Sequence, residues 1–517
     1  MKKRFLSICL AMISALSLVF SGCGEKGKDE LGLNGKVAPD YSESTLQYDF
    51  YGYSSASNGE WSIDNVKYSA GEDFRTVERV KEYKDAGMTI YFPQSAAAYS
   101  GQEWESSQTK RALDNAVAAG LDKVILHDPR IQSLSKREKP VIGPDEDQYP
   151  TEEALDAYVA ECMAPYRDHE AFYGIMLGDE PFYFMAEAYG QIYRSVRRVM
   201  PECYIQYNLN PITAGTGWNS KENMSNIDYR FPALEEGDEG YGEELDEQTE
   251  LVLRYEKYLE LFLDGTGTDV LQYDQYPFRS AIKCDEYYLL GLQVASRLCK
   301  ERNLKFYFVT QTYGQHETDV PRMLSQADLY WLNNMLVGFG IKQISYFTYF
   351  TKSDNTTEHF IDGNSFITWT GEKTDIYYWM QQIMKEEQRF APTVLNFEYN
   401  TSKIFVKQPT TFNSAHVMRT IETPDFIALK NATFNKECGL ITELYDAEKD
   451  NYLYMVQNIV DPIHKGSKVF QTCELQFNSK YKYAVVFVKG EKTLVNLKNG
   501  KLTLKHKPGE ATYVLPY

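Results

Sequence analysis

Between residues 47 and 351 the chain alternates short apolar runs with longer segments in which apolar residues recur every three or four positions. Eight of the short runs are rich in β-branched and aromatic residues: 48–56, 88–94, 123–131, 173–181, 204–211, 269–277, 305–314 and 342–351. Such runs are apolar at nearly every position, which is typical of parallel strands that are buried on both faces. The pattern therefore predicts eight parallel strands alternating with helices.

The segments between the runs carry helix signals. They span 74–87, 109–120, 151–168, 186–200, 251–265 and 288–303, and several end on Gly or Asn just before the next strand, as helix C-caps do. An open doubly wound sheet would normally begin with a Gly-rich phosphate loop, and this chain has none. We therefore predict an α/β fold in which residues 46–391 form a closed (β/α)8 TIM barrel.

The pattern changes near Pro392. From there on, short runs alternate apolar and polar residues with period two: 402–408, 426–434, 451–460, 473–478, 483–490, 492–506 and 511–516. Lys498-Asn499-Gly500 is a hairpin signal within this part. The pattern predicts that residues 392–517 form an antiparallel β-sandwich domain packed beside the barrel.

The first 45 residues have a different character. Three basic residues at 2–4 precede an uncharged apolar run over 5–20, which is the order of an export signal. The run ends in Ser-Gly-Cys23 and resembles the lipobox of bacterial lipoproteins, although Phe20 stands where an aliphatic residue is usual. The resemblance implies a lipoprotein signal peptide over 1–22, a lipid on Cys23 and a flexible tether over 23–45. An ordinary secretory signal is the alternative.

Charge and apolar length restrict the partners. The formal net charge is −19 and the pI is about 5.0, so nothing basic is available to neutralise phosphates, and nucleic acid is excluded. No second apolar stretch reaches the ~18 residues that span a bilayer. Membrane contact is therefore expected only through the lipid on Cys23, which would anchor the protein on the extracytoplasmic face of the cell membrane.

No cofactor and no metal are predicted. The six cysteines after the signal lack the close spacing of a zinc site and are expected to be buried thiols, with a disulfide as the alternative that export permits. A Gly- and acid-rich insertion at 212–248 is expected to be a solvated loop at the catalytic face, with a calcium site as the alternative.

Polar residues mark the C-terminal ends of the predicted strands, where the active sites of TIM barrels lie. We predict three catalytic carboxylates there: Glu180, Asp179 and Asp274. The predicted substrate-binding residues are His127, Asp128, Asn208, Tyr273, Tyr276, Gln311, Tyr313 and Tyr346. Carboxylates, amides and rings that converge suit a carbohydrate, whose hydroxyls need hydrogen-bond partners and whose C–H faces stack on aromatics. A carbohydrate is therefore the predicted substrate.

Glu180 is the predicted catalytic acid. Cleavage of a glycosidic bond needs a protonated carboxyl for the leaving oxygen and a second carboxylate as nucleophile or water activator. Pro181 biases Glu180 toward an extended backbone, and Gly178 allows the strand to end just before the acidic pair. The alternative is a surface acid that caps a helix or forms an ion pair.

The segment Gly178-Asp179-Glu180-Pro181 resembles the barrel glycoside hydrolases that place an acid/base glutamate at the end of strand four. Ala86-Gly87-Met88 before the second strand and the passage 360–395 after the eighth are similar to that superfamily as well. The resemblance covers about residues 45–400 and implies a glycoside hydrolase with Glu180 in that role. One departure is serious, because the retaining members carry a nucleophilic glutamate at the end of strand seven, where this chain has Gln311.

Two arrangements would supply the missing group. In the first, Asp179 and Glu180 resemble the dyad of retaining hexosaminidases such as glycoside hydrolase families 20 and 123, in which the substrate's acetamido group is the nucleophile. Neighbours in a regular strand point to opposite faces, so this arrangement needs a strand broken at Gly178. In the second, Asp274 is the nucleophile or the general base.

The rival class is a non-catalytic glycan-binding lipoprotein on a glycosidase-like barrel. Gln311 favours that class, while the three acids at strand ends oppose it. An esterase lacks support because the chain has no Gly-x-Ser-x-Gly elbow. The sequence thus predicts an exported, lipid-anchored glycoside hydrolase and leaves open the sugar, the linkage and the stereochemical course.

Overall fold

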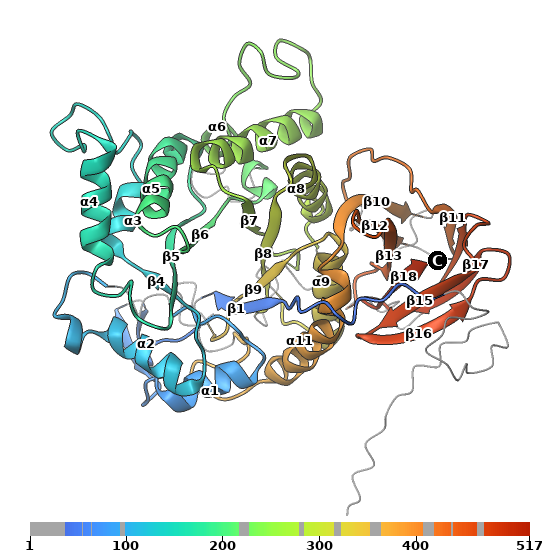
Figure 1. Ribbon diagram of the computed structural model, residues 1–517, viewed down its shortest axis with the longest axis horizontal. Helices are drawn as coiled ribbons and strands as arrows, with labels where there is room; N and C mark the ends of the chain where they lie inside the picture. Colours follow the sequence, from blue (N-terminus) through green and yellow to red (C-terminus); the bar gives the residue numbers. More distant parts are fainter. Residues whose placement is uncertain are drawn as a thin grey trace, which may run out of the picture.

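A computed structural model describes residues 37–53, 55–63, 65–93, 99–216, 227–278, 284–314, 322–351, 363–406, 418–435, 438–462 and 470–517. Parallel strands and helices form the N-terminal part of the chain, and antiparallel strands form the C-terminal part (Figure 1). The predicted signal peptide, Cys23 and most of the tether lie outside the described residues. Within those ranges, no helix has the length and apolarity that a membrane crossing requires.

Seven strands build two parallel sheets. The first sheet has the order β1 (Asp49–Tyr53), β9 (Gln343–Phe347), β8 (Lys305–Gln311) and β7 (Val270–Asp274). The second has the order β4 (Val124–His127), β5 (Phe172–Asp179) and β6 (Tyr204–Asn208). Each of these strands coincides with one of the predicted runs, so the mixed α/β character expected from the sequence is confirmed.

Backbone bridges link the two sheets. Leu209 bridges Tyr273 in parallel and so joins the end of β6 to β7. The remaining predicted run, 88–94, contributes a parallel bridge between Tyr91 and Val124. On its other side the Ile90 amide donates to the Phe50 carbonyl over 3.1 Å. This run therefore lies between β1 and β4.

Helices overlap the predicted helical segments and begin and end on the expected signals. They are α1 (Val77–Asp85), α2 (Gln108–Ala119), α4 (Glu152–Met163), α5 (Ala186–Val199), α7 (Glu247–Thr266) and α8 (Tyr288–Arg302). Ser107, Thr151 and Asp246 cap the first turns of α2, α4 and α7. Gly120, Gly267 and Asn303 end α2, α7 and α8 in the left-handed conformation.

Shorter elements lie in the connections between the parallel strands. A hairpin of β2 (Glu60–Ile63) and β3 (Val66–Ser69) follows β1, and α3 (Pro129–Ser135) follows β4. The other short pieces are η2 (Trp104–Ser106), η3 (Tyr183–Met185), η4 (Ile212–Gly215) and α6 (Ile227–Arg230). Of these, η3, η4 and α6 follow β5 and β6 and are the ones that border the candidate site.

Two further helices, α9 (Gln326–Gly338) and α11 (Asp375–Val394), lie between the parallel strands and the C-terminal strands (Figure 1). Helix α9 is buried on most of its surface because it packs against β8 on one side and β12 and β13 on the other. That explains why its sequence lacks the polar face of a surface helix. Helix α11 continues through Pro392 to Val394, so the change of pattern expected at 392 falls inside its last turn.

The C-terminal strands form two antiparallel sheets. The larger has the order β10 (Glu398–Val406), β12 (Cys438–Asp446), β13 (Asn451–Asn458), β18 (Ala511–Pro516), β15 (Tyr483–Val488) and β16 (Glu491–Asn496). The smaller contains β11 (Leu429–Phe434), β14 (Gln471–Phe477) and β17 (Lys501–His506). Ile441 and Val456 from the larger sheet and Leu475 and Leu504 from the smaller belong to one buried cluster.

Two features of these sheets were not predicted from the sequence. Strand β12 is buried along nearly its whole length, so it lacks the alternation that marked its neighbours. The predicted hairpin at Lys498-Asn499-Gly500 was wrong, because β16 pairs with β15 and β17 pairs with β14. Asn499 and Gly500 still adopt left-handed φ angles of 54° and 77°, and their turn carries the chain from one sheet to the other.

Buried polar contacts join the two parts of the chain. Arg322, only 2% exposed, donates to both carboxylate oxygens of Asp461 at 2.9 and 2.7 Å and also pairs with Asp328 at the start of α9. The Trp331 indole donates to the Ile459 carbonyl over 3.1 Å. The cysteines at 162, 203, 284, 299, 438 and 473 are buried thiols, as the sequence predicted.

Candidate active site

Alternate residues of the parallel strands point to opposite sides. On the inner side, Tyr51, Tyr53, Phe92, Met176 and Val309 belong to one buried cluster, against which Phe347 packs. On the outer side, Tyr273 and Tyr346 join the core formed with the helices. Because Asp274 follows Tyr273 in β7, its side chain points to the inner side, together with this cluster.

The end of β5 is irregular, and the irregularity brings two neighbouring acids to the same end of the strand. Pairing with β6 shifts register between Met176 and Gly178, which marks a bulge. Glu180 has a φ of 43°, and its amide donates to the Asn208 carbonyl over 2.8 Å. Asp179 and Glu180 are both exposed. The break that the paired-acid arrangement needs is present, whereas the extended backbone predicted for Glu180 was wrong.

Gly178 lies just before this break and packs closely against α5. A Cβ atom at position 178 would lie 1.8 Å from the Tyr189 hydroxyl, so no side chain fits there. Tyr189 is itself buried on α5. The glycine thus allows α5 to pack closely against the strand just before the acidic pair.

Two tyrosine hydroxyls lie among the three predicted catalytic carboxylates. Burial raises the pKa of Tyr276 well above its usual value, and a hydrogen bond to Asp274 and the charges of Asp179 and Glu180 raise it further. Burial likewise raises the pKa of Tyr53, as do Asp179 and Asp274. Such electrostatic effects require proximity. Asp179, Glu180 and Asp274 therefore lie in one region, at the ends of β5 and β7, which flank the end of β6.

Tyr276 also forms part of the wall of this region. Its ring stacks on Phe347, with centroids 5.2 Å apart and planes 25° apart. Asp274 is only 5% exposed, in contrast with the exposed Glu180. The region therefore has the buried carboxylate of Asp274, the exposed carboxylate of Glu180 and the stacked rings of Tyr276 and Phe347 along one side.

Asn208 and Gln206 contribute unsatisfied hydrogen-bonding groups on β6. Asn208 is 1% exposed and donates from Nδ2 to Oδ1 of Asp179 over 3.0 Å, but its Oδ1 has no partner in the part of the chain that the structure describes. The same holds for both amide atoms of Gln206, also 1% exposed. Because a buried unpaired polar atom is costly, an ordered water or a ligand hydroxyl would stabilise this site.

The residue after Glu180 is held in place by hydrogen bonds. The Pro181 carbonyl accepts from the Tyr258 hydroxyl over 2.9 Å and from Asn210 Nδ2 over 2.7 Å. Asn210 Oδ1 in turn accepts from Arg230 Nη1 over 3.0 Å. This arrangement, the Pro181 brace, connects α7, α6 and the end of β6 to the backbone that carries Glu180.

Several predicted substrate-binding residues have other roles. Asp128 is fully buried, caps α3, pairs with Arg130 at 2.7 Å and accepts from the Tyr166 hydroxyl. Gln311 is 2% exposed, and its amide bonds the backbone of Phe278 and Tyr313. Both side chains stabilise the fold through these contacts, and their role as substrate ligands stays a prediction.

Three predicted tyrosines are buried as well. Tyr273 is fully buried among the rings of Tyr255, Phe306 and Phe308. Tyr346 donates to Asn333 of α9 over 3.0 Å, and Tyr313 is 2% exposed. The alternation of their strands points Tyr273 and Tyr346 to the helices, so their predicted contact with a substrate finds no support in this packing.

His127 ends β4 beside Met176 of β5 and is half-buried. Its Nε2 is hydrogen-bonded to the Gln132 side chain. Burial lowers the pKa of the ring below its usual value, which favours the neutral form at neutral pH. A neutral ring is able to donate or accept a hydrogen bond but brings no charge to the site.

Tyr53, Phe347, Tyr258 and Arg230 were not predicted from the sequence, and Asn210 was expected only as a polar residue at the end of its strand. Side chains alternate between the two faces of a strand. Applied to the first and eighth runs, this alternation places Tyr53 and Phe347 on the inner side, where Asp274 also points. The other three act through the backbone of Pro181, and nothing in their local sequence indicates this contact.

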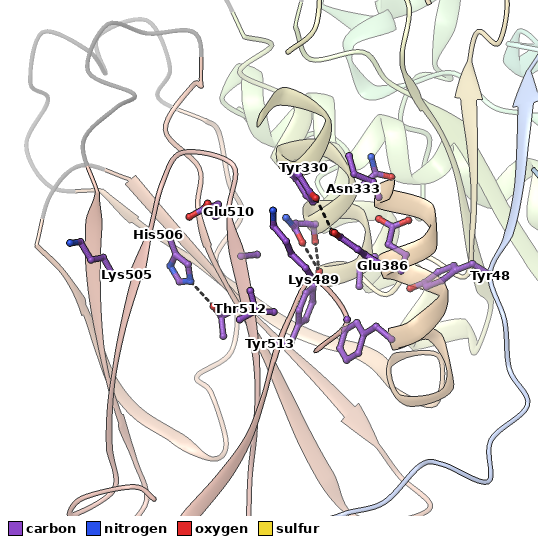
Figure 2. Close-up of a pocket in the computed structure, with 18 residues that line it drawn as sticks. Tyr48, Tyr330, Asn333, Glu386, Lys489, Lys505, His506, Glu510, Thr512 and Tyr513 are labelled. Carbon is purple, nitrogen blue, oxygen red and sulfur yellow. Dashed lines mark hydrogen bonds between the residues drawn. The ribbon is translucent and has the colours of Figure 1, made fainter. Parts of the chain in front are cut away.

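A separate cavity lies between α9, α11 and the C-terminal strands (Figure 2). Tyr330, Tyr513, Glu386, Glu387 and Lys489 are among the residues that line it. The Tyr330 hydroxyl donates to Glu386 over 2.8 Å, a contact that Figure 2 shows. The cavity offers about 40 Å³, room for a few water molecules but not for a sugar ring.

No family model matches the chain, and no curated protein matches it either. Among solved structures it is similar to a GH27 β-L-arabinopyranosidase from Geobacillus stearothermophilus, with 11% identity, a TM-score of 0.42 and coverage of 92% of this chain and 97% of that one. It is also similar to a GH30 endoxylanase from Clostridium papyrosolvens C71, with 10% identity, a TM-score of 0.38 and coverage of 92% and 98%. At these TM-scores the likenesses carry no argument about the reaction of this chain.

Proposed function

We propose that the parallel strands close into a (β/α)8 TIM barrel over residues 46–391 and that residues 392–517 form a β-sandwich domain. Backbone bonds join each successive pair of the eight predicted runs, and the pairing of β9 with β1 joins the last run to the first. The shared buried cluster of the two C-terminal sheets supports the sandwich. The carboxylates described above then lie at the C-terminal mouth of the barrel.

We propose that the protein is a glycoside hydrolase that cleaves O-glycosidic bonds by carboxylate acid/base catalysis. The observation that carries this proposal is the placement of Asp179, Glu180 and Asp274 at the ends of β5 and β7, on the two sides of β6. Glu180, the outer and exposed acid, protonates the leaving oxygen. Asp274, the deep acid, is the nucleophile or the base that activates water.

A substrate-assisted course is the second mechanism that the geometry supports. The regular strand is broken just before Asp179 and Glu180, as this course needs, and Asn208 binds Asp179 from β6. In that course Asp179 orients the acetamido group of an N-acetylated sugar. The distance between the Glu180 and Asp274 carboxyls distinguishes the two roles proposed for Asp274. A distance of about 5–5.5 Å favours a nucleophilic Asp274, and about 6.5–9.5 Å favours an Asp274 that activates water.

Gln311 supports one rival function, a non-catalytic glycan-binding protein. Its amide is fixed to the backbone of Phe278 and Tyr313, so position 311 offers no carboxylate to a substrate. In that case the unsatisfied amides of Gln206 and Asn208 would bind sugar hydroxyls without any reaction. Both functions require a carbohydrate ligand, but only the hydrolase cleaves it.

The test is a glycoside screen with the full-length protein in detergent. It uses aryl glycosides of common hexoses, pentoses and N-acetylhexosamines, and it measures both aglycone release and sugar binding by calorimetry. Turnover of a glycoside supports the hydrolase. Binding without turnover supports the glycan-binding protein, and the absence of both contradicts a carbohydrate function.

We also propose that the protein is anchored by a lipid on Cys23 at the extracytoplasmic face of the membrane. Support comes from the basic residues at 2–4, the apolar run over 5–20 and the Ser-Gly-Cys ending. The polar tether over 23–45 would then hold the barrel away from the lipid surface, where glycans are accessible.

A further inference from the structure

Three aromatic rings gather just beyond Glu180, and we refer to Phe182, Phe184 and Tyr229 as the aromatic platform. The rings of Phe182 and Phe184 stack with centroids 5.3 Å apart and planes 16° apart. Tyr229 of α6 stands nearly perpendicular to both, with centroids 5.0 and 6.1 Å away. Tyr229 is 42% exposed, whereas Phe182 and Phe184 are half-buried. Tyr229 is therefore the ring that a ligand reaches most directly.

The platform is attached to the same brace that holds Pro181. The Arg230 guanidinium lies over the Phe182 ring at 4.7 Å and donates to Asn210 over 3.0 Å. Asn210 donates to the Pro181 carbonyl over 2.7 Å. The segment after β5 and helix α6 are thus joined by both ring packing and hydrogen bonds. A rigid aromatic surface of this kind loses little conformational entropy when a ligand stacks on it.

The platform lies on the Glu180 side of the carboxylates. Asp274 is deep on β7, whereas Phe182 and Phe184 follow Glu180 by two and four residues and leave the strand with it. In glycoside cleavage the acid contacts the bridging oxygen, and the departing group extends beyond that oxygen. Rings that follow Glu180 in the chain, and that are linked through Arg230 and Asn210 to the backbone of Pro181, are therefore placed on the side of the departing part of the substrate.

We propose that the aromatic platform binds a sugar ring on the leaving-group side of the scissile bond, with Tyr229 as the stacking residue. The substrate class is then an oligosaccharide or polysaccharide, in which another sugar follows the cleaved bond, and not a glycoside with a small leaving group. This inference rests on the proposed glycoside hydrolase function. The C–H face of a pyranose is apolar and stacks on an aromatic ring, while its hydroxyls stay solvated.

The experiment compares two substrates that share the sugar identified in the glycoside screen. One is the glycosyl fluoride, whose leaving group has no ring, and the other is the trisaccharide of that sugar. We expect Tyr229→Ala in the full-length protein to lower the ratio of kcat/KM for the trisaccharide to that for the fluoride by about tenfold, the loss of one stacking contact. Tyr229→Phe keeps the ring and should keep most of the ratio.

Tyr378→Ala is the matched control, because Tyr378 is 55% exposed and lies on α11. Its ratio should equal that of the wild type. An unchanged ratio in Tyr229→Ala, or an equal loss in Tyr229→Phe, overturns the platform as a sugar site. If Tyr229→Ala does not fold, Tyr229→Leu, which keeps bulk without a planar ring, gives the same comparison.

Failure of the proposed function has a different signature. A wild type that cleaves neither the fluoride nor the trisaccharide overturns the hydrolase and the leaving-group assignment together. A wild type that cleaves the fluoride but not the trisaccharide retains the hydrolase and overturns only the substrate class.

Discussion

Asn208 of β6 donates a hydrogen bond of 3.0 Å from Nδ2 to Oδ1 of Asp179, the last residue of β5. The next residue, Glu180, instead uses its backbone amide to bond the carbonyl of the same asparagine. One residue therefore positions two neighbouring acids through two different groups. Asn208 thus fixes the side chain of Asp179 but only the backbone of Glu180. This difference fits the proposed roles, in which Glu180 donates a proton and Asp179 orients the substrate.

Replacement of Glu180 by glutamine should lower kcat on aryl glycosides by about 10²–10⁴-fold, because an amide cannot supply the proton to the leaving oxygen. Binding of the sugar should change little. The glycosyl fluoride should be cleaved with a much smaller loss, since fluoride departs without protonation. Glu187→Gln, an exposed glutamate on α5, serves as the control. Equal losses on both substrates would argue against Glu180 as the acid.

Tyr276→Phe should reduce kcat by about tenfold, because it removes the hydrogen bond from the hydroxyl to Asp274. Burial and the neighbouring carboxylates raise the pKa of Tyr276 well above 10, so the hydroxyl stays protonated over the whole working range. The loss should therefore be the same at every pH. A pH–rate profile of the variant that changes shape, and not only height, would contradict this role.

The stability of the protein should depend on Glu387, which faces the cavity of Figure 2. Burial raises its pKa well above the usual value, and the adjacent Glu386 raises it further. A raised folded-state pKa contributes stability that is fully present below the unfolded pKa of about 4.3 and is lost as pH rises through the folded value.

Chemical unfolding at a series of pH values tests this dependence. Glu387→Gln should reduce the fall in unfolding free energy with rising pH, because glutamine does not ionise, and the part due to Glu256, whose pKa burial also raises, should remain. The exposed Glu244→Gln should leave the whole fall in place. Tyr48 and Tyr513 lie close enough for Glu387 to raise their pKa values, but both are raised well above 10, so they stay neutral in this range. Parallel curves for wild type and Glu387→Gln would contradict the assignment.

Arg322→Met should destabilise the protein by about 3–5 kcal/mol, because it leaves the buried carboxylates of Asp328 and Asp461 without their cation. Arg389→Met offers a surface comparison. Arg389 pairs with Glu491, and their side chains are 45% and 70% exposed, so about 0–1 kcal/mol is expected. Denaturant unfolding measures both, and similar small losses would show that the buried pairs contribute little.

Cys23→Ala should release the protein from the membrane into the soluble exported fraction. Cys23 lies outside the described residues, so this prediction depends on the signal sequence alone. Fractionation of cells that express the wild type and the variant is the measurement. A variant that stays with the membrane fraction would contradict lipidation at this residue.

The strands and helices of the N-terminal part were predictable because their signals are local. Apolar runs, serine or threonine caps and final glycines specify β4, α2 and α7 within their own sequences. Strand β12 and helix α9 were not, since both are buried on several sides and lose the periodicity that exposure creates.

The candidate site was predictable in part for the same reason. Asp179, Glu180 and Asp274 follow from their strand ends, but the roles of Asp128 and Gln311 depend on partners that the sequence does not place. Asp128 is committed to Arg130 and Tyr166, and Gln311 to the backbone of Phe278 and Tyr313. Such commitments are set by tertiary contacts, which local patterns do not encode.

The left-handed backbone at Glu180 makes a side chain at this position costly for stability. A residue with a Cβ at a φ of 43° costs roughly 1–2 kcal/mol relative to glycine. Selection for stability alone would thus replace Glu180 by glycine, or by asparagine, which tolerates this conformation. In the proposed hydrolase the carboxyl of Glu180 compensates for this cost, so variants selected only for thermal stability should drift away from glutamate at position 180 and lose activity as they do.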